Sequence, residues 1–170
     1  MCSSDLKNRK IITAHTDETI VSASVLLEKM PNDAPVFSTL VKEDSGIIDK
    51  PIARSVKDRK KMAVDDKGRR AVTYFTVKER FGDYTLVEFK LATGRTHQIR
   101  VHAKYINHPV VGDTTYGKKD DFGLKGQLLH AYKLELTHPR TGERMTFTAP
   151  LPDYFSAFIT SNFVNAVFLV

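Results

Sequence analysis

The stretch "YTLVEFKLATGRTHQIRVHAKYIN", residues 84–107, changes its hydrophobic period halfway along. Residues 84–91 alternate between two faces, which predicts a β-strand with one buried side. Gly94 then ends the strand. Over residues 96–107 the apolar positions recur at steps of three and four, which predicts a helix that Thr96 can cap. A strand that leads directly into a helix indicates a domain containing both kinds of element.

Working outward, the flanking segments predict two antiparallel hairpins. Residues 69–80 form the first strand of one hairpin, and "FGD" at 81–83 is its turn. Downstream, two further strand patterns over 127–139 and 144–150 flank the turn "RTGE". The fold class is therefore α+β, with a mainly antiparallel mixed sheet and flanking helices.

The remaining segments give weaker patterns. Residues 16–31 have apolar positions at helical steps and predict a helix, and residues 34–41 predict a short strand. The segment 42–72 holds ten basic and six acidic residues with little periodicity, which predicts a long charged loop with short extended pieces. A last helix is expected to begin around Pro152 and Asp153.

Composition limits the class of protein. The 170 residues suffice for one domain, and 26 Lys and Arg against 20 Asp and Glu give a formal charge of +6. This surplus favours polyanionic partners such as nucleic acid. The single cysteine, Cys2, excludes an internal disulfide, and no apolar run approaches the length of a membrane span, so we expect a cytoplasmic protein. The opening "CSSDL" suggests a start derived from a sequencing adapter and fused to a shortened gene; an ordinary polar tail is the alternative.

The segment from Gly94 to His102 holds two arginines, two histidines and a glutamine. His97 and His102 are five residues apart, about 140° around a helix, so they cannot share a metal as an i, i+4 pair can. The sequence also lacks a Gly-x-Ser-x-Gly nucleophile motif and the Walker phosphate loop. These patterns give no support to a metal site, a hydrolase or a nucleotidase.

Binding of nucleic acid agrees better with this segment. Free backbone N–H groups at the start of a helix favour a phosphate, and the guanidinium groups of Arg95 and Arg100 suit phosphate or carboxylate. Thr96 and Gln98 offer neutral hydrogen bonds. An electrostatic rim upstream is expected from four cations: Arg54, Arg59, Lys60 and Lys61. Ordinary salt bridges to acidic residues of the chain remain the alternative for the two arginines.

Three segments, in the same order, resemble the RluA family of RNA pseudouridine synthases. They are "IDKPIARSVKDRKKMAV" (48–64), "LATGRTHQIRVHAKYINHPVVGDTTYG" (91–117) and "LLHAYKLELTHPRTGERMTFTAPLP" (128–152). The resemblance implies the catalytic-domain fold of that family and the isomerisation of uridine to pseudouridine in ribosomal or transfer RNA. It implies no metal and no organic cofactor.

The resemblance also implies roles for individual residues. The family's catalytic aspartate lies in an Arg-Leu-Asp segment and pairs with an arginine that corresponds here to Arg100. A base-stacking tyrosine of the family corresponds to Phe37, which keeps the ring and lacks the hydroxyl. Contact with RNA is expected from the basic rim and from Arg95, Thr96, His97 and Gln98.

The chain departs from the family in one respect: no Arg-Leu-Asp segment is present. We therefore divide it into an atypical or non-native segment 1–34, the C-terminal part of a catalytic domain at 35–153, and a C-terminal helix or tail at 154–170. The expectation is a catalytically incomplete synthase, truncated at its N-terminal side, in which Arg100 has no carboxylate partner. The alternatives are a non-catalytic RNA-binding module and a fragment too incomplete to fold well.

Overall fold

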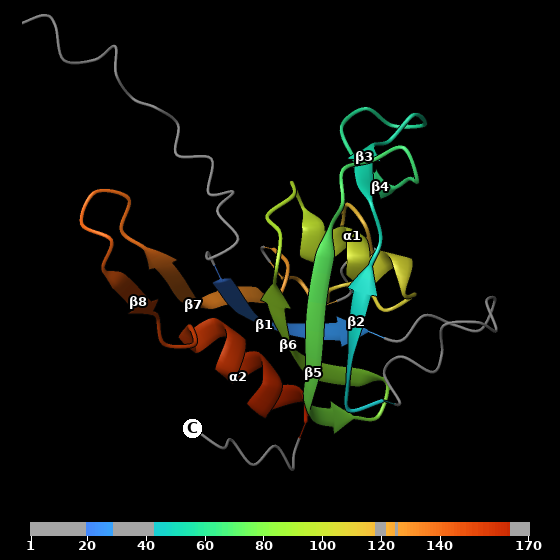
Figure 1. Cartoon of the computed structure of the whole chain (residues 1–170). Coiled ribbons are helices and arrows are strands. Elements are labelled where there is room, and N and C mark those ends of the chain that lie inside the picture. The colour runs from blue at the N-terminus through green and yellow to red at the C-terminus, as the bar shows by residue number, and fades with distance from the viewer. Residues whose placement is uncertain (1–19, 29–42, 118–121, 125, 164–170) are drawn as a thin grey trace, which may run out of the picture.

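The computed structural model describes residues 20–28, 43–117, 122–124 and 126–163. Within these residues the main sheet has six strands in the order β2-β5-β6-β1-β7-β8, and every neighbouring pair is antiparallel. Figure 1 shows this sheet with helices α1 and α2 beside it. The predicted α+β class is confirmed. The strands of the main sheet are β1 (Ile20–Glu28), β2 (Ser45–Asp49), β5 (Val72–Phe81), β6 (Tyr84–Leu91), β7 (Leu129–Thr137) and β8 (Arg144–Thr148).

The helix predicted over residues 16–31 is wrong, because residues 20–28 form strand β1 in the interior of the sheet. Both faces of β1 are covered: Val25 belongs to one hydrophobic cluster and its neighbour Leu26 to another. Val25, Leu26 and Leu27 are apolar on both faces of the strand, so the alternation typical of a one-sided strand is missing there. Residues 20–28 of the predicted segment 1–34 thus belong to the same sheet as β6 and β7, to which they are hydrogen-bonded.

The two predicted hairpins are confirmed. In β6 the expected face is buried, with Thr85, Val87 and Phe89 each exposed by 5% or less. The turn between β5 and β6 places Gly82 at φ 63°, a left-handed conformation that glycine adopts without a steric penalty. β7 and β8 pair along residues 133–137 and 144–148.

The charged segment 42–72 contains the short extended pieces that were expected. β2 is an edge strand of the main sheet, and β3 (Ile52–Arg54) pairs with β4 (Met62–Val64) in a small separate hairpin. This β3–β4 hairpin projects beyond the main sheet at the top of Figure 1. Gly68 lies against its base, where an added Cβ would stand 2.5 Å from the backbone carbon of Ile52.

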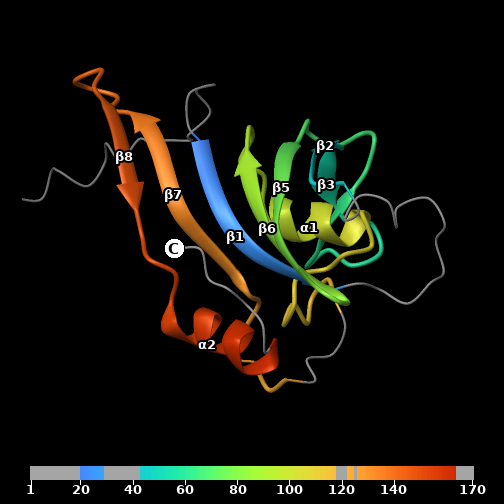
Figure 2. The same ribbon diagram turned by 90° about the horizontal axis from the view of Figure 1, so that it is seen from below.

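Helices α1 (Gln98–Tyr105) and α2 (Asp153–Asn162) pack against opposite faces of the sheet, and they lie apart in Figure 2. The face of β1 that carries Val25 meets the apolar side of α1, and the face that carries Leu26 meets α2. The predicted helical stripe is confirmed, since Ile99, Ala103 and the helix-ending Ile106 are all buried.

Two predictions lie outside the described residues, namely the strand over residues 34–41 and its Phe37. No helix among the described residues is long and apolar enough to cross a membrane.

Candidate functional site around Arg100

Arg100 forms a bidentate ion pair with Asp113. Its Nε and Nη2 each donate a hydrogen bond of 2.7 Å, to Oδ2 and Oδ1 of the carboxylate respectively. The Asp113 side chain is fully buried, whereas that of Arg100 keeps 15% exposure. Parallel hydrogen bonds of this kind fix the plane of the guanidinium as well as its position.

The electrostatics of the pair favour both charged forms. Burial by itself raises the pKa of Asp113, but hydrogen bonds from Arg100 and from backbone N–H groups, together with the arginine charge, lower the pKa overall. The pKa of Arg100 is raised, chiefly by its hydrogen bonds to Asp113, against the opposing effect of burial. The pair is therefore ionised throughout the physiological range.

The expectation that Arg100 lacks a carboxylate partner is wrong. Asp113, 13 residues further along the same motif, is its partner, which is the ordinary salt bridge given as the alternative. Its Oδ1 also accepts hydrogen bonds of 3.0 Å from the backbone N–H groups of Thr115 and Tyr116, so the turn holds the carboxylate in place. An Asp that accepts backbone N–H groups two and three residues later is a known turn pattern, and "GDTTY" could have indicated it.

The start of α1 brings three of the predicted RNA contacts together. The helix begins at Gln98, and the preceding residue, His97, adopts a left-handed conformation with φ 56° and makes no side-chain cap. Thr96 is therefore not the N-cap, and both Thr96 and His97 are exposed. Arg95 is half-buried, with its Nε donating to the carbonyl oxygen of Arg70 at 2.9 Å.

The predicted RNA contact by Gln98 is wrong, because its side chain is only 2% exposed and its hydrogen bonds are taken within the protein. Its Nε2 donates to the Val72 carbonyl and to the Thr73 hydroxyl, both at 2.9 Å. Its Oε1 accepts from the Thr93 hydroxyl at 2.8 Å and from the Arg95 N–H at 2.9 Å. Gln98 is thus a structural residue that ties α1 to the start of β5.

His102, one helical turn further on, completes the same network. It is fully buried, with Nδ1 2.8 Å from the Thr73 hydroxyl and Nε2 3.0 Å from the Lys50 carbonyl oxygen. Since Thr73 accepts from Gln98, its own hydrogen is available for Nδ1 of His102, which leaves Nε2–H to donate to Lys50. Burial lowers the pKa of His102, in agreement with a neutral ring.

The four cations of the predicted rim all lie on the β3–β4 hairpin. Arg54, Arg59 and Lys60 are exposed, and Lys61 is half-buried. Nη1 of Arg54 donates to the carbonyl oxygen of Arg59 at 2.6 Å, which links the end of β3 to the loop that follows it. Asp58 reaches Lys61 at 3.9 Å and accepts the N–H of Lys60, so one carboxylate organises the turn without neutralising the whole cluster.

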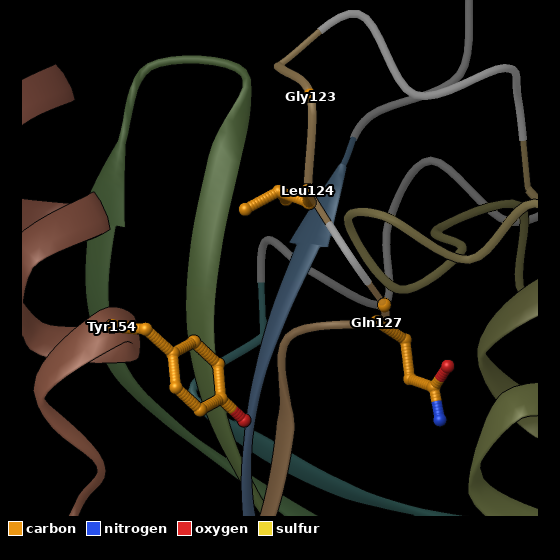
Figure 3. A pocket seen from close by; sticks show the side chains of 5 residues that line it. Gly123, Leu124, Gln127 and Tyr154 are labelled. Carbon is orange, nitrogen blue, oxygen red and sulfur yellow. The ribbon is translucent and has the colours of Figure 1, made fainter.

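A cavity of about 510 Å³ lies elsewhere, between α2 and the segment before β7. Figure 3 shows Tyr154 reaching from α2 toward the segment that carries Leu124. Among the described residues the lining carries no charge: it consists of Gly123, Leu124, Gly126, Gln127 and Tyr154. Among the described residues, no group of three His, Cys, Asp or Glu side chains could hold a metal ion.

Comparison with known proteins identifies close relatives. The family model described as RNA pseudouridylate synthase matches residues 12–105, that is 94 of the 170 residues. The chain is 54% identical over 118 residues to the uncharacterized RNA pseudouridine synthase YlyB of Bacillus subtilis, covering 69% of this chain and 39% of that protein. It is 41% identical over 140 residues to ribosomal large subunit pseudouridine synthase D of Haemophilus influenzae, and the match covers 75% of this chain and 43% of that protein. The chain thus spans about two fifths of the length of these curated relatives.

Solved structures agree with the sequence relatives. Human RNA pseudouridylate synthase domain containing 1 matches with a TM-score of 0.63 and 28% identity, over 79% of this chain and 55% of that one. Human RNA pseudouridylate synthase domain containing 4 matches with a TM-score of 0.60 over 84% of this chain and 61% of that one. Because its sequence identity is only 21%, this match supports the fold alone. The predicted fold family is confirmed, and the family match begins inside the segment 1–34.

Proposed function

Because the chain belongs to the RNA pseudouridylate synthase family, we propose that it supplies the arginine-bearing and RNA-contacting part of a site that isomerises uridine in RNA. The observation that carries this proposal is the ion pair of Arg100 and Asp113, which fixes a guanidinium beside the exposed residues Thr96 and His97. Relatives named as ribosomal large subunit synthases make ribosomal RNA the first substrate to test. The single cysteine agrees with the cytoplasmic setting that we propose for it.

In this proposal Arg100 holds a catalytic carboxylate ionised and oriented. Asp113 already occupies its Nε and Nη2, so a second carboxylate would have to approach Nη1 or displace Asp113. The cations of the β3–β4 hairpin and Arg95 would neutralise RNA phosphates. No step of this proposal requires a metal or an organic cofactor from the protein.

We further propose that the polypeptide does not isomerise uridine by itself, because its sequence contains no Arg-Leu-Asp segment. The test uses RNA labelled with tritium at C5 of uridine. Rejoining the base to ribose C1′ through C5 displaces the hydrogen at that carbon, so each turnover releases tritium to water. We expect no release above that of a protein-free control. Sustained release would overturn the proposed inactivity, and Asp113→Asn would then test whether Asp113 is the nucleophile.

A non-catalytic RNA-binding module is the second candidate function, and the charge of +6 with the exposed cations of the β3–β4 hairpin favours it. This function predicts that log K for single-stranded RNA falls linearly with log salt. Replacing Arg59 and Lys60 by alanine should reduce the slope by about 1.4, since each phosphate contact to single strands contributes roughly 0.7. Arg140→Ala, in the exposed β7–β8 turn, is the matched control and should leave the slope unchanged. Binding that ignores salt, or an equal effect of the control, would exclude this role of the hairpin.

A further inference from the structure

Tyr116 contacts three parts of the proposed site at once, although it is only 7% exposed. The face of its ring lies under the Arg100 guanidinium, whose Cζ is 4.9 Å from the ring centroid. Its hydroxyl is 2.9 Å from Nδ1 of His97. The same hydroxyl accepts a hydrogen bond of 2.9 Å from the backbone N–H of Met62, at the start of β4.

These hydrogen bonds favour the tautomer of His97 that carries its proton on Nε2. The N–H of Met62 can only donate, so the Tyr116 oxygen accepts from it and the phenolic hydrogen remains to be placed. Nδ1 of His97 is the acceptor within reach, which leaves the imidazole proton on Nε2. Burial and then the charge of Arg100 lower the pKa of His97, so the neutral ring prevails at pH 7.

The backbone at His97 supports the same arrangement. Residues other than glycine are uncommon in the left-handed region, yet His97 stands there with φ 56°. The carbonyl oxygen of His97 accepts from the Val101 N–H at 2.9 Å, and the buried Gln98 follows it directly. The surrounding structure therefore holds His97 in a conformation that the residue alone does not favour.

We propose that Tyr116 is a positioning residue that presents His97 as an outward Nε2–H donor for an RNA acceptor oxygen and joins the β3–β4 hairpin to Arg100. The RNA part of this inference rests on the proposed function. Through Met62 the hydroxyl anchors β4, and through its ring it supports the guanidinium. Tyr116 would then keep a constant distance between an RNA strand bound by the hairpin cations and a group bound by Arg100.

The first test needs no RNA. Nitrogen NMR of the histidine rings at pH 8 should show His97 protonated at Nε2 in the wild type. In Tyr116→Phe the Met62 amide should exchange with solvent about tenfold faster, because its acceptor is gone. The amide of Ile52, which donates to the Arg69 carbonyl oxygen across the base of the hairpin, should keep its rate if the hairpin itself remains folded. Protonation of Nδ1 in the wild type, or an unchanged Met62 rate, would overturn the proposal even if RNA binds as expected.

The second test separates the His97 hydrogen bonds from its backbone conformation. Asparagine accepts a hydrogen bond through its side-chain oxygen, offers an outward N–H and tolerates the left-handed region, whereas glycine only tolerates that region. With a uridine-rich RNA of about 20 nucleotides, His97→Asn should bind nearly as wild type, and His97→Gly and Tyr116→Phe about fivefold more weakly, as expected for one lost hydrogen bond. Tyr154→Phe, at a position of α2 that is 58% exposed, is the matched control. Equal affinity of the glycine variant and the wild type would overturn the donor role, whereas failure of the wild type to bind RNA at low salt would refute the proposed function and leave the NMR result standing.

Discussion

Replacing Asp113 by asparagine tests the electrostatic basis of the site. The substitution keeps the size of the side chain, and the asparagine oxygen can still accept from the N–H groups of Thr115 and Tyr116. It removes the negative charge and places an amide N–H against Nε of Arg100, which donates to the carboxylate at 2.7 Å in the wild type. A guanidinium with 15% exposure is then left without its counter-charge.

The size of the effect follows from this burial. Breaking a buried ion pair by removing one partner costs about 3–5 kcal/mol, and we expect the low end because Arg100 retains some contact with water. A loss of about 3 kcal/mol corresponds to roughly 6–12 °C in Tm for a chain of this length. The same substitution in Asp49, whose pair with Arg70 spans 3.7 Å between side chains 53% and 76% exposed, should cost less than about 1 kcal/mol.

Urea and thermal unfolding at several pH values provide the measurement. Because the folded state lowers the pKa of Asp113, the stability from the pair is fully present above the unfolded value of about 4 and is lost as the pH falls through the folded value. The difference between wild type and Asp113→Asn should thus be constant from pH 5 to 8 and shrink in stronger acid. A variant as stable at pH 7 as Asp49→Asn would refute the reasoning, and so would a difference that grows on acidification.

Three further predictions concern the buried network and the hairpin. Gln98→Ala should lower the free energy of unfolding by about 1–3 kcal/mol in urea titrations, because it removes the buried hydrogen bonds of Gln98 with the Val72 carbonyl and with the hydroxyls of Thr73 and Thr93. Burial lowers the pKa of His102, so the unfolded chain binds the proton more readily; wild-type stability should fall below about pH 6.5, and His102→Gln should flatten this dependence. Gly68→Ala should disturb the β3–β4 hairpin, since a Cβ there would approach the Ile52 backbone within 2.5 Å, and the Ile52 amide should then exchange faster.

The sequence predicted the elements whose burial differs from one face to the other. β6 and α1 each have a single buried face, so their hydrophobic period reports the element directly. β1 was mistaken for a helix because β6 and β7, more than 50 and 100 residues away along the chain, place it in the interior of the sheet with both faces covered. The information that decides this element is tertiary and does not lie in its own nine residues.

The orientation of single side chains between Gly94 and His102 was also only partly predictable from the sequence. Resemblance identified Arg100, and the turn pattern of "GDTTY" could have indicated that backbone N–H groups hold Asp113, but the pairing of the two residues is visible only in the folded structure. Among the RNA contacts predicted in this segment, namely Arg95, Thr96, His97 and Gln98, the structure buries Gln98.

The spacing of residues along α1 explains which donors between Gly94 and His102 are buried and which lie near Tyr116. Gln98 and His102 are four residues apart and share the buried side of α1 with Ile99, whereas His97 and Arg100 are three apart and lie toward the turn that carries Tyr116. The inward pair, Gln98 and His102, attaches α1 to β5 through Thr73. This attachment holds the outward pair, His97 and Arg100, in a stable position. Substitutions of the inward pair should therefore change stability and RNA affinity together, while His97→Gly should change affinity with little loss of stability, because glycine relieves the left-handed strain. Unfolding and binding measurements on the same variants would separate the two sets, and a large stability loss in His97→Gly would contradict this division.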